Sequence, residues 1–395
     1  MEIPSVKPRN YSIISGKDNL IPAWELPNLP FTEFFGTFNS NFPSVDQNLM
    51  YCPDSGVFQL SHEVDPAFLY HPNNYNFRTL TSPKIHAELD FLINSTSLQT
   101  SLNLESRILE IGGNNSVLAE KLNGRFSRYV VCDPILGDTD FGKISYWGGL
   151  IEDNLARVAA LQPNVIIGRH VLEHVNSPLE MLQGLIDSTS KPIVFIFEFP
   201  NFRLMQKRQR LDAVFHQHLN YFDENSIVRL VESLGCKVLT LESNLQGSNG
   251  GSLIVSFTNI ASSEADNRNY SEKVHQSTLE DFSESLSLFS SQARLLETTI
   301  QSWKGQKVGF GAGLMLATLN YHTRGAIEEL SGIYDDDLEK SDMEYQNIRL
   351  KILHSSHLSD AESNLVVITS MENQRAIRNR LQQNFKSTIV GFQIN

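Results

Sequence analysis

RILEIGGNN at residues 107–115 joins a short apolar run to a pair of glycines, and this stretch decides the fold. Five mostly apolar residues are the length of a buried strand, and Gly112-Gly113 ends it. Residues 117–122 then have the composition of a helix. A glycine turn lets a ligand approach the backbone, and a helix start offers free N–H groups. The stretch therefore predicts a strand–turn–helix unit that binds a cofactor.

The same alternation continues on both sides of this unit. A stretch with helical spacing, in which Ile85, Leu89 and Leu92 share one face, precedes it. Further apolar runs occur at residues 129–133, 164–168, 192–197, 237–241 and 253–257. Apolar strands that alternate with helices indicate a parallel sheet covered on both faces. We expect a Rossmann-like α/β domain over residues 83–260.

Other regions flank this domain. Residues 1–82 are rich in Pro, Asn and Phe without periodicity, which predicts a small loop-rich N-terminal lobe. Residues 261–300 have heptad-like apolar positions and predict a helical connector of one or two helices. Strand runs that end in glycine or acid recur at residues 307–311, 332–337 and 365–369. They predict a second Rossmann-like α/β domain over residues 301–395, and 395 residues are long enough for these parts.

Composition excludes several classes of protein. Lys plus Arg number 32 and Asp plus Glu number 45, which gives a net charge of −13. Binders of nucleic acid or of anionic membranes need clustered positive charge, so we expect neither partner. The three cysteines form no CxxC pair, which argues against a disulfide scaffold or a thiolate zinc site. We find no signal peptide and no apolar run that spans a membrane, and we expect a cytoplasmic protein.

The residues around the glycine turn indicate the cofactor. Asp133 ends the second strand twenty residues after Gly113, where a carboxylate can accept both hydroxyls of an adenosine ribose. This spacing fits either a nicotinamide cofactor or S-adenosylmethionine. The turn lacks the second and third glycines of a dinucleotide motif, and Glu110 precedes the first glycine by two residues, as is typical of class I methyltransferases. We therefore expect S-adenosylmethionine, with an ordinary strand-to-helix turn as the alternative.

The third strand adds a histidine to this site. It runs into RHVLEHV at residues 169–175, and His170 lies just past its carboxyl end, where open α/β sheets bind ligands. For His174 we favour a capping or core role. The residues expected to bind the cofactor are Glu110, Gly112, Gly113, Asn114, Asp133, Pro134 and His170.

Ordered motifs along the chain resemble those of the sugar C-methyltransferase family. The central motifs are EIGGNN (110–115), VVCDP (130–134), RHVLEHV (169–175), FEFPNF (197–202), FHQHLNYF (215–222) and GSNGGSLIV (247–255). The outer motifs are MYCPDSGVFQL (50–60), YNFRTLTSPKIHAEL (75–89), KVGFGAG (307–313) and IYDDDLEK (333–340). The resemblance thus covers most of the chain, and an ordered set is much more specific than one glycine turn.

The resemblance implies an S-adenosylmethionine-dependent enzyme that methylates a carbon of a nucleotide-linked 4-keto-deoxy sugar. It implies a zinc-binding N-terminal lobe, a central class I methyltransferase domain, and a C-terminal Rossmann-like domain that helps to hold the nucleotide sugar. His218 matches the family's base, which takes a proton to give an enolate. If its segment is extended, His216 points to the same face and can orient His218. The catalytic residues expected are His218, His216, Gln217 and Tyr75.

Donors for a nucleotide diphosphate are expected in several places. Residues 203–210 carry a run of cations in an acidic protein, which can meet a pyrophosphate or form a solvated helix face. The glycine turn at residues 309–313 resembles a phosphate-cradling turn, or serves strand–helix packing. Residues 249–252 match the family's substrate-side loop. The residues expected to bind substrate are Asn201, Arg203, Asn249, Gly250 and Gly311.

The chain departs from the family at three places. The family's two CxxC pairs correspond here to SIISG (12–16) and CPDSG (52–56), so three of four zinc ligands are serine, a poor ligand. We expect this lobe to keep its shape without zinc, and we expect no other metal. The family's Tyr-His-Glu-His motif begins here with Phe215 and has Gln217 in place of the glutamate. The glycine turn continues as Asn115-Ser116 instead of Asp-Gly.

These departures leave three functions open. The first is C-methylation of a nucleotide-linked sugar. The second is methylation of an oxygen or nitrogen of another small metabolite by the same fold, which the changes at Phe215 and Gln217 motivate. The third is a binding or scaffold protein without turnover, which the lost cysteines and the altered turn motivate. In each case the partner is a small molecule, and the sequence carries no signal for an oligomeric state.

Overall fold

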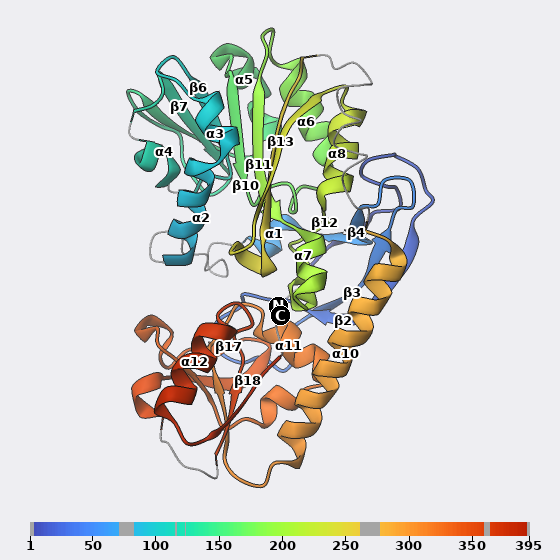
Figure 1. Ribbon diagram of the computed structural model, residues 1–395, viewed down its shortest axis with the longest axis vertical. Helices are drawn as coiled ribbons and strands as arrows, with labels where there is room; N and C mark the ends of the chain where they lie inside the picture. The colour runs from blue at the N-terminus through green and yellow to red at the C-terminus, as the bar shows by residue number, and fades with distance from the viewer. Residues whose placement is uncertain are drawn as a thin grey trace.

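The computed structural model describes residues 4–70, 83–114, 117–122, 124–260, 277–358 and 364–392. Figure 1 shows a central α/β domain at the top and a C-terminal α/β domain at the bottom. An N-terminal sheet and one long helix lie between and beside them. Among the described helices, none is both long and apolar enough to cross a bilayer.

An eight-stranded sheet forms the centre of the upper domain. Its order is β13-β14-β11-β10-β6-β7-β9-β8. The strands are β6 (Arg107–Ile111), β7 (Arg128–Asp133), β8 (Thr139–Phe141), β9 (Ile144–Gly148), β10 (Val165–Arg169), β11 (Val194–Pro200), β13 (Lys237–Asn244) and β14 (Ser252–Thr258). Five neighbours, from β9 to β11, run parallel, but β13 and β14 pair antiparallel. The expected parallel sheet thus forms its centre, whereas antiparallel strands complete both edges, β14 and β13 at one and β8 at the other. The sequence did not show this because an apolar run does not encode strand direction.

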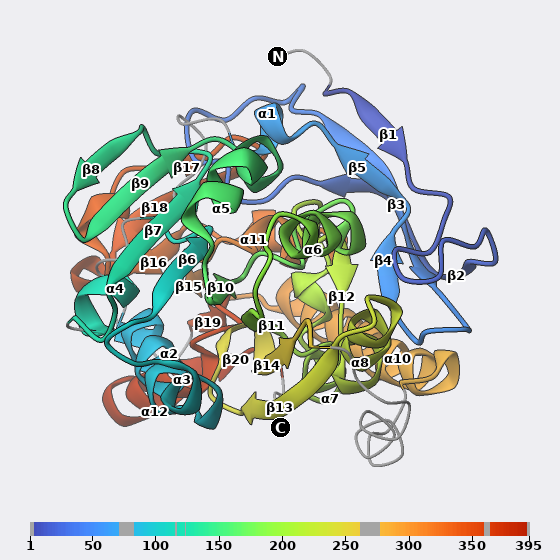
Figure 2. The same ribbon diagram turned by 90° about the horizontal axis from the view of Figure 1, so that it is seen from above.

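Helices cover both faces of this sheet, as Figure 2 shows from above. One face packs against α2 (Pro83–Asn94), α3 (Thr96–Ser101) and α4 (Val117–Leu122). The other packs against α5 (Leu155–Leu161), α6 (Pro178–Asp187) and α8 (Glu224–Ser233). Alternate strand residues serve the two cores: in β6, Ile108 joins the first and Leu109 the second. The central strands β10 and β11 are largely apolar because both of their faces are buried.

The N-terminal lobe is a real sheet that includes part of the catalytic motif. Its order is β12-β4-β3-β2, and β1 pairs separately with β5. The elements are β1 (Val6–Pro8), β2 (Ile21–Pro30), β3 (Ser44–Tyr51), β4 (Phe58–Leu60), β5 (His62–Val64), α1 (Pro66–Leu69) and β12 (Asn220–Tyr221). Asn220 and Tyr221 pair with Gln59 and Phe58, so the segment 215–222 supplies the edge strand of this sheet. The sequence predicted loops here because the strands of this lobe lack an unbroken apolar pattern.

A continuous core joins the N-terminal lobe to the C-terminal domain. The helix α10 (Leu279–Ser302) begins at Thr278, which forms a capping box with Asp281. Its Phe282 and Phe289 pack against Trp24 of β2. Figure 1 shows α10 running past the N-terminal sheet and down the C-terminal domain. Within the described part of the expected connector, residues 277–300, there is one helix from residue 279, and residues 261–276 lie outside the described part.

The C-terminal domain is the expected second Rossmann-like unit. Its sheet has the order β17-β18-β16-β15-β19-β20, parallel except for β17. The strands are β15 (Lys307–Phe310), β16 (Ile333–Asp335), β17 (Glu344–Tyr345), β18 (Ile348–His354), β19 (Leu365–Ile368) and β20 (Thr388–Val390), with helices α11 (Leu316–His322) and α12 (Gln374–Asn384). Asp335 at the end of β16 accepts the Ala312 amide at 2.6 Å, which ties the second strand end to the glycine turn.

Two turns of the N-terminal lobe meet where the family resemblance places zinc ligands. Ser12 and Ser15 belong to one turn, and Cys52 and Ser55 to the other. The Ser15 hydroxyl lies 3.9 Å from the Cys52 sulfur, and the Cys52 thiol also contacts the Ser12 and Ser55 side chains. The four positions therefore converge. One buried thiol with three neutral hydroxyls does not suit zinc, which is held in structural sites by thiolates and imidazoles.

We expect that restoring the thiols restores zinc binding. The triple variant S12C/S15C/S55C supplies four thiolates from two turns that already meet, so it should bind about one Zn²⁺ per chain. Zinc content after gel filtration measures this, and the single variant Ser15→Cys is the control. A triple variant that folds but retains no zinc would contradict the convergence of these turns.

Candidate active site

The glycine turn after β6 is held by the carboxylate at the end of β7. Asp133 accepts the Asn114 amide at 2.9 Å and the Ile135 amide at 3.0 Å. Gly112 and Asn114 have positive φ angles of 67° and 47°, which tighten the turn. Pro134 next to Asp133 is exposed. The glycine turn and Asp133 thus meet at the carboxyl ends of β6 and β7, and their role as a cofactor cradle stays a prediction.

Glu110 supports this cradle from beneath. Its carboxyl group is buried and accepts the Tyr129 hydroxyl at 2.8 Å. A Cβ at Gly113 would lie 2.6 Å from the carboxyl carbon of Glu110, so only glycine fits above it. Burial raises the pKa of Glu110 to about 7. These contacts make Glu110 a support of the turn, and its expected contact with the cofactor stays a prediction.

Charged side chains gather where β10 and β11 end. Arg169 donates from Nε to Glu198 at 2.8 Å, and its Nη2 lies 3.6 Å from Glu88 of α2. His170, which has a positive φ of 52°, lies 3.0 Å from Glu173 through its Nδ1. Burial lowers the pKa of His170, but the carboxylates of Glu173, Glu198 and Glu88 together raise it above the ordinary value. His170 therefore lies at the same sheet edge as the glycine turn, as expected.

The motif FHQHLNYF (residues 215–222), which contains the expected base, forms a turn at residues 215–218, so its two histidines separate. The His218 amide donates to the Phe215 carbonyl at 3.0 Å. His216 packs on Phe31, donates from Nε2 to the Leu29 carbonyl at 2.9 Å, and has its Nδ1 3.3 Å from the Gln47 amide. Both nitrogens of His216 are thus engaged within the protein. The expectation that His216 shares a face with His218 was wrong, because it assumed an extended segment.

Gln217 links the motif to two neighbours. Its side-chain oxygen accepts the Thr32 hydroxyl at 3.2 Å, and its backbone carbonyl accepts Nδ1 of His174 at 2.8 Å. The first contact comes from the N-terminal lobe and the second from the loop after β10. Gln217 therefore joins the lobe to the cofactor domain, while a role toward substrate stays a prediction.

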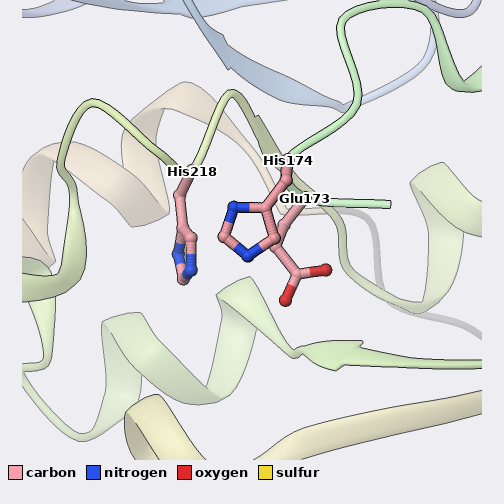
Figure 3. A group of neighbouring side chains, drawn as sticks. All are labelled: Glu173, His174 and His218. Carbon is pink, nitrogen blue, oxygen red and sulfur yellow. The ribbon is translucent and has the colours of Figure 1, made fainter. Parts of the chain in front are cut away.

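His218 is buried beside His174. Its ring lies 4.9 Å from the His174 ring and 4.3 Å from the Phe215 ring. Burial first, then His174 and His170, lower the pKa of His218 well below its ordinary value. Within the described residues, neither ring nitrogen of His218 has a hydrogen-bond partner. Figure 3 shows the His218 and His174 rings next to each other in a nearly perpendicular arrangement, with the Glu173 carboxylate beside His174.

One buried guanidinium fixes the relative positions of these segments. Arg9 donates to the Leu219 carbonyl at 2.8 Å and the Asn220 side chain at 2.7 Å. It also donates to the Asn176 backbone carbonyl at 2.9 Å and to the Leu60 carbonyl at 3.1 Å. Burial lowers the pKa of Arg9 to about 10, so it remains cationic at neutral pH. Arg9 thus joins the N-terminal lobe, the loop after β10 and the catalytic motif.

The expected substrate residues near α7 (Phe202–Lys207) have structural partners. The Asn201 side chain accepts the Arg203 and Leu204 amides as the helix cap, and donates to Glu224 at 2.8 Å. Arg203 lies 3.9 Å from the same carboxylate. Asn201 is wholly buried, so its helix-capping role accounts for it, while Arg203 remains partly exposed.

The other expected substrate residues meet at the junction of the two α/β domains. Asn249 donates its amide to Glu372 at 3.1 Å, and Arg210 and Lys84 also pair with Glu372. Gly250 next to Asn249 has a φ of 94°, and a Cβ there would lie 3.1 Å from Arg210. A Cβ at Gly311 would lie 2.5 Å from the side chain of Ser370, two residues before Glu372. Tyr75, Asn115 and Ser116 lie outside the described residues.

Sequence reasoning missed several residues of this site. Arg9 stands in a polar N-terminal segment without periodicity, which gave no signal. Glu173 and His174 stand in the quoted motif RHVLEHV, and two acid–base side chains in sequence after a strand were an available signal. Their partnership with His218, 44 residues later, depends on the tertiary fold alone.

A family model described as "Methyltransferase domain" matches residues 84–241. These residues contain the glycine turn, Asp133, His170 and the catalytic motif. The central part of the chain is therefore a methyltransferase domain, and S-adenosylmethionine is its cofactor. The glycine turn, Asp133 and His170 are the groups of this structure that suit that cofactor.

The chain is similar to several methyltransferases at low sequence identity. C-methyltransferase NovU of Streptomyces niveus is 22% identical over 214 residues, which are 53% of this chain. The match covers 50% of that relative, so the chain spans about half the length of the curated relative it matches. The solved N-methyltransferase NodS from Bradyrhizobium japonicum WM9 is 16% identical with a TM-score of 0.32, covering 45% of this chain and 98% of that chain. Magnesium protoporphyrin IX methyltransferase (ChlM) from Synechocystis PCC 6803 is 13% identical with a TM-score of 0.33. The match covers 44% of this chain and 83% of that chain.

We expect the buried Glu110 to give folding stability a measurable pH dependence. Its pKa is higher in the folded protein than its ordinary value, so folding binds a proton and stability falls as pH rises from about 4.5 to about 7. Glu110→Gln keeps an acceptor for Tyr129 and removes this effect, which amounts to at most about 3 kcal/mol. Urea unfolding of both proteins at pH 5 and pH 8 measures it. Equal pH dependence in the two proteins would contradict the buried, protonated state of Glu110.

We expect Arg9 to be needed for stability beyond any surface cation. Arg9→Met leaves several buried carbonyls without donors and should lower the free energy of unfolding by about 3–5 kcal/mol. Lys7→Met, at an exposed position of β1, is the matched control and should cost less than about 0.5 kcal/mol. Urea unfolding compares the two, and equal stability would show that Arg9 does not hold these segments together.

Proposed function

We propose that the chain transfers a methyl group from S-adenosylmethionine to a carbon next to the ketone of a nucleotide-linked 4-keto-deoxy sugar. The observation that carries this proposal is the buried imidazole of His218, whose ring nitrogens have no hydrogen-bond partner within the described residues. It lies beside His174, which is in the loop that follows the carboxyl end of β10. The ordered motifs of the sugar C-methyltransferases and the likeness to a protein named as a C-methyltransferase support it.

His218 takes the proton in this reaction. The carbon next to a ketone loses H⁺ to the imidazole, and the electron pair of that C–H bond moves into the enolate. S-adenosylmethionine supplies a methyl group on a cationic sulfur, and the pair of the C–S bond stays on sulfur as the enolate carbon binds the methyl. Arg9, Gln217 and Phe215 hold the His218 turn, so the base is in place before substrate arrives.

The cations around Glu372 are the proposed site for the nucleotide diphosphate. Arg210 and Lys84 approach this carboxylate with the Asn249 amide, so the donors already surround one anion. Arg guanidinium and backbone N–H groups suit phosphate oxygens. The glycine turn at Gly311 reaches the same junction from the C-terminal domain. The donors thus lie at the junction of the two α/β domains, near the cofactor domain.

Methylation of an oxygen is the second candidate. Phe215, whose ring packs at 4.3 Å against His218, replaces the tyrosine of the family and so removes a hydroxyl next to the proposed base. An acceptor that is already nucleophilic depends less on a base than a carbon does. Replacement of His218 therefore separates the two candidates.

We expect His218→Ala to lower the rate of methyl transfer to a dTDP-4-keto-6-deoxyhexose by about 10²–10⁴-fold. Transfer of labelled methyl from S-adenosylmethionine measures turnover. Exchange of the carbon-bound hydrogen with D₂O, in the presence of S-adenosylhomocysteine, measures proton abstraction by itself. His357→Gln, at an exposed histidine of the C-terminal domain, is the control and should leave both rates unchanged.

Two results would overturn the proposal. One is full exchange in the His218→Ala variant, which would remove His218 as the base. The other is the absence of exchange and transfer with every keto-sugar nucleotide tried, by protein that binds S-adenosylmethionine. Methylation of an oxygen that persists in His218→Ala would favour the second candidate.

A further inference from the structure

Three side chains that can act as metal ligands converge near the carboxyl end of β10. Glu173, His174 and His218 each offer one ligand atom, and these atoms all lie within 4.8 Å of one another. Glu173 and His174 follow β10, whereas His218 comes from the turn that the N-terminal lobe covers (Figure 3). Glu173 and His218 are buried and His174 is partly buried. Two imidazoles and one carboxylate form a ligand set that divalent transition metals use.

The outer partners prepare these side chains as ligands. Nδ1 of His174 donates to the Gln217 carbonyl at 2.8 Å, which leaves the lone pair of its Nε2 free. The Glu173 Oε1 accepts Nδ1 of His170 at 3.0 Å. Hydrogen bonds of this kind, from a ligating imidazole to a carbonyl and to a ligating carboxylate, orient ligands in metal sites. The backbone is fixed too, because the Glu173 carbonyl accepts the Leu219 and Asn220 amides at 2.7 and 3.1 Å.

One oxygen of the buried Glu173 carboxylate lacks a hydrogen-bond partner, which is a second observation that points to a bound ligand. The Glu173 side chain is 2% exposed, and its Oε2 has no hydrogen-bond partner within the described residues. A buried carboxylate oxygen without a donor is costly unless a cation or a donor meets it. Neither ring nitrogen of His218 has a partner in the described part of the chain. The cluster therefore holds one buried carboxylate oxygen without a hydrogen-bond partner, next to the imidazole of His218.

We propose that Glu173, His174 and His218 bind a divalent transition-metal cation, with at least one coordination position left open for an oxygen of the acceptor molecule. Ligands about 2.0–2.2 Å from one ion lie roughly 3–3.5 Å apart, so the side chains must move inward by about 1 Å. Small side-chain rotations achieve this, since the backbones are already tied together. The sequence-based expectation of no metal rested on the cysteine count, which says nothing about histidine and carboxylate ligands.

The cation changes what the site can do. An open position accepts an oxygen of the acceptor molecule, such as a ketone, an enolate or an alkoxide, and stabilises its negative charge. The nitrogen of His218 that binds the cation no longer takes a proton. The metal-bound and base-competent forms of His218 are therefore alternative states, and added metal should slow the proposed exchange reaction.

Metal binding is measured without any acceptor, so it stands apart from the proposed function. Full-length protein is treated with a chelator, dialysed, and titrated with Co²⁺, whose visible absorption reports nitrogen and oxygen ligation. We expect about one Co²⁺ per chain, displaced by Zn²⁺. His174→Ala and Glu173→Gln should each weaken binding by more than about 100-fold, since loss of outer partners alone costs 10–100-fold. His357→Gln should bind like the unchanged protein.

The variants also need a control for folding. S-adenosylmethionine affinity and the unfolding temperature of each variant, without metal, show whether the domain is intact. Loss of Co²⁺ binding by folded Glu173→Gln and folded His174→Ala supports the site. Absence of Co²⁺ binding at millimolar concentration, or equal binding in all variants, overturns it. Exchange with D₂O that Zn²⁺ slows and chelator restores further supports the site, whereas unchanged exchange with bound Zn²⁺ excludes His218 as a ligand.

Discussion

The buried guanidinium of Arg9 is the interaction on which the rest of the site depends. It is contributed by the N-terminal lobe, but its acceptors belong to the loop after β10 and to the catalytic motif. A planar cation with five donors can satisfy carbonyls from several segments at once, which lysine cannot do. The position of His218 relative to the cofactor edge is therefore set by a residue that touches neither. The small lobe thus helps to fix the position of the proposed base.

The two α/β domains share one contact between a strand end and a glycine turn. In both α/β domains an aspartate at the end of the second strand accepts an amide of the glycine turn after the first strand. In the central domain this shapes the expected cofactor cradle, and in the C-terminal domain it shapes the turn at Gly311. Between them, Glu372 gathers the cations Arg210 and Lys84. The proposed diphosphate site thus lies at the junction of the two α/β domains.

Much of the fold could be predicted from the sequence, and less of the site. Residues 107–133 gave the strand–glycine–helix–strand–acid pattern because buried strands and glycine turns are local features. The antiparallel pair β13 and β14 was missed because strand direction is not local. His216 was misplaced because a turn at residues 215–218 brings its ring to Leu29 and not to His218. Arg9 and the neighbourhood of His174 and His218 depend on contacts between distant segments, which no single-sequence pattern records.

The most direct test of this account is a crystal structure with S-adenosylhomocysteine and a 4-keto-deoxy sugar nucleotide. A ring nitrogen of His218 should lie about 3 Å from the carbon next to the ketone, on the side that faces the sulfur. The diphosphate should also contact Arg210 or Lys84. A structure in which His218 remains packed between Phe215 and His174, with another side chain nearest that carbon, would contradict it.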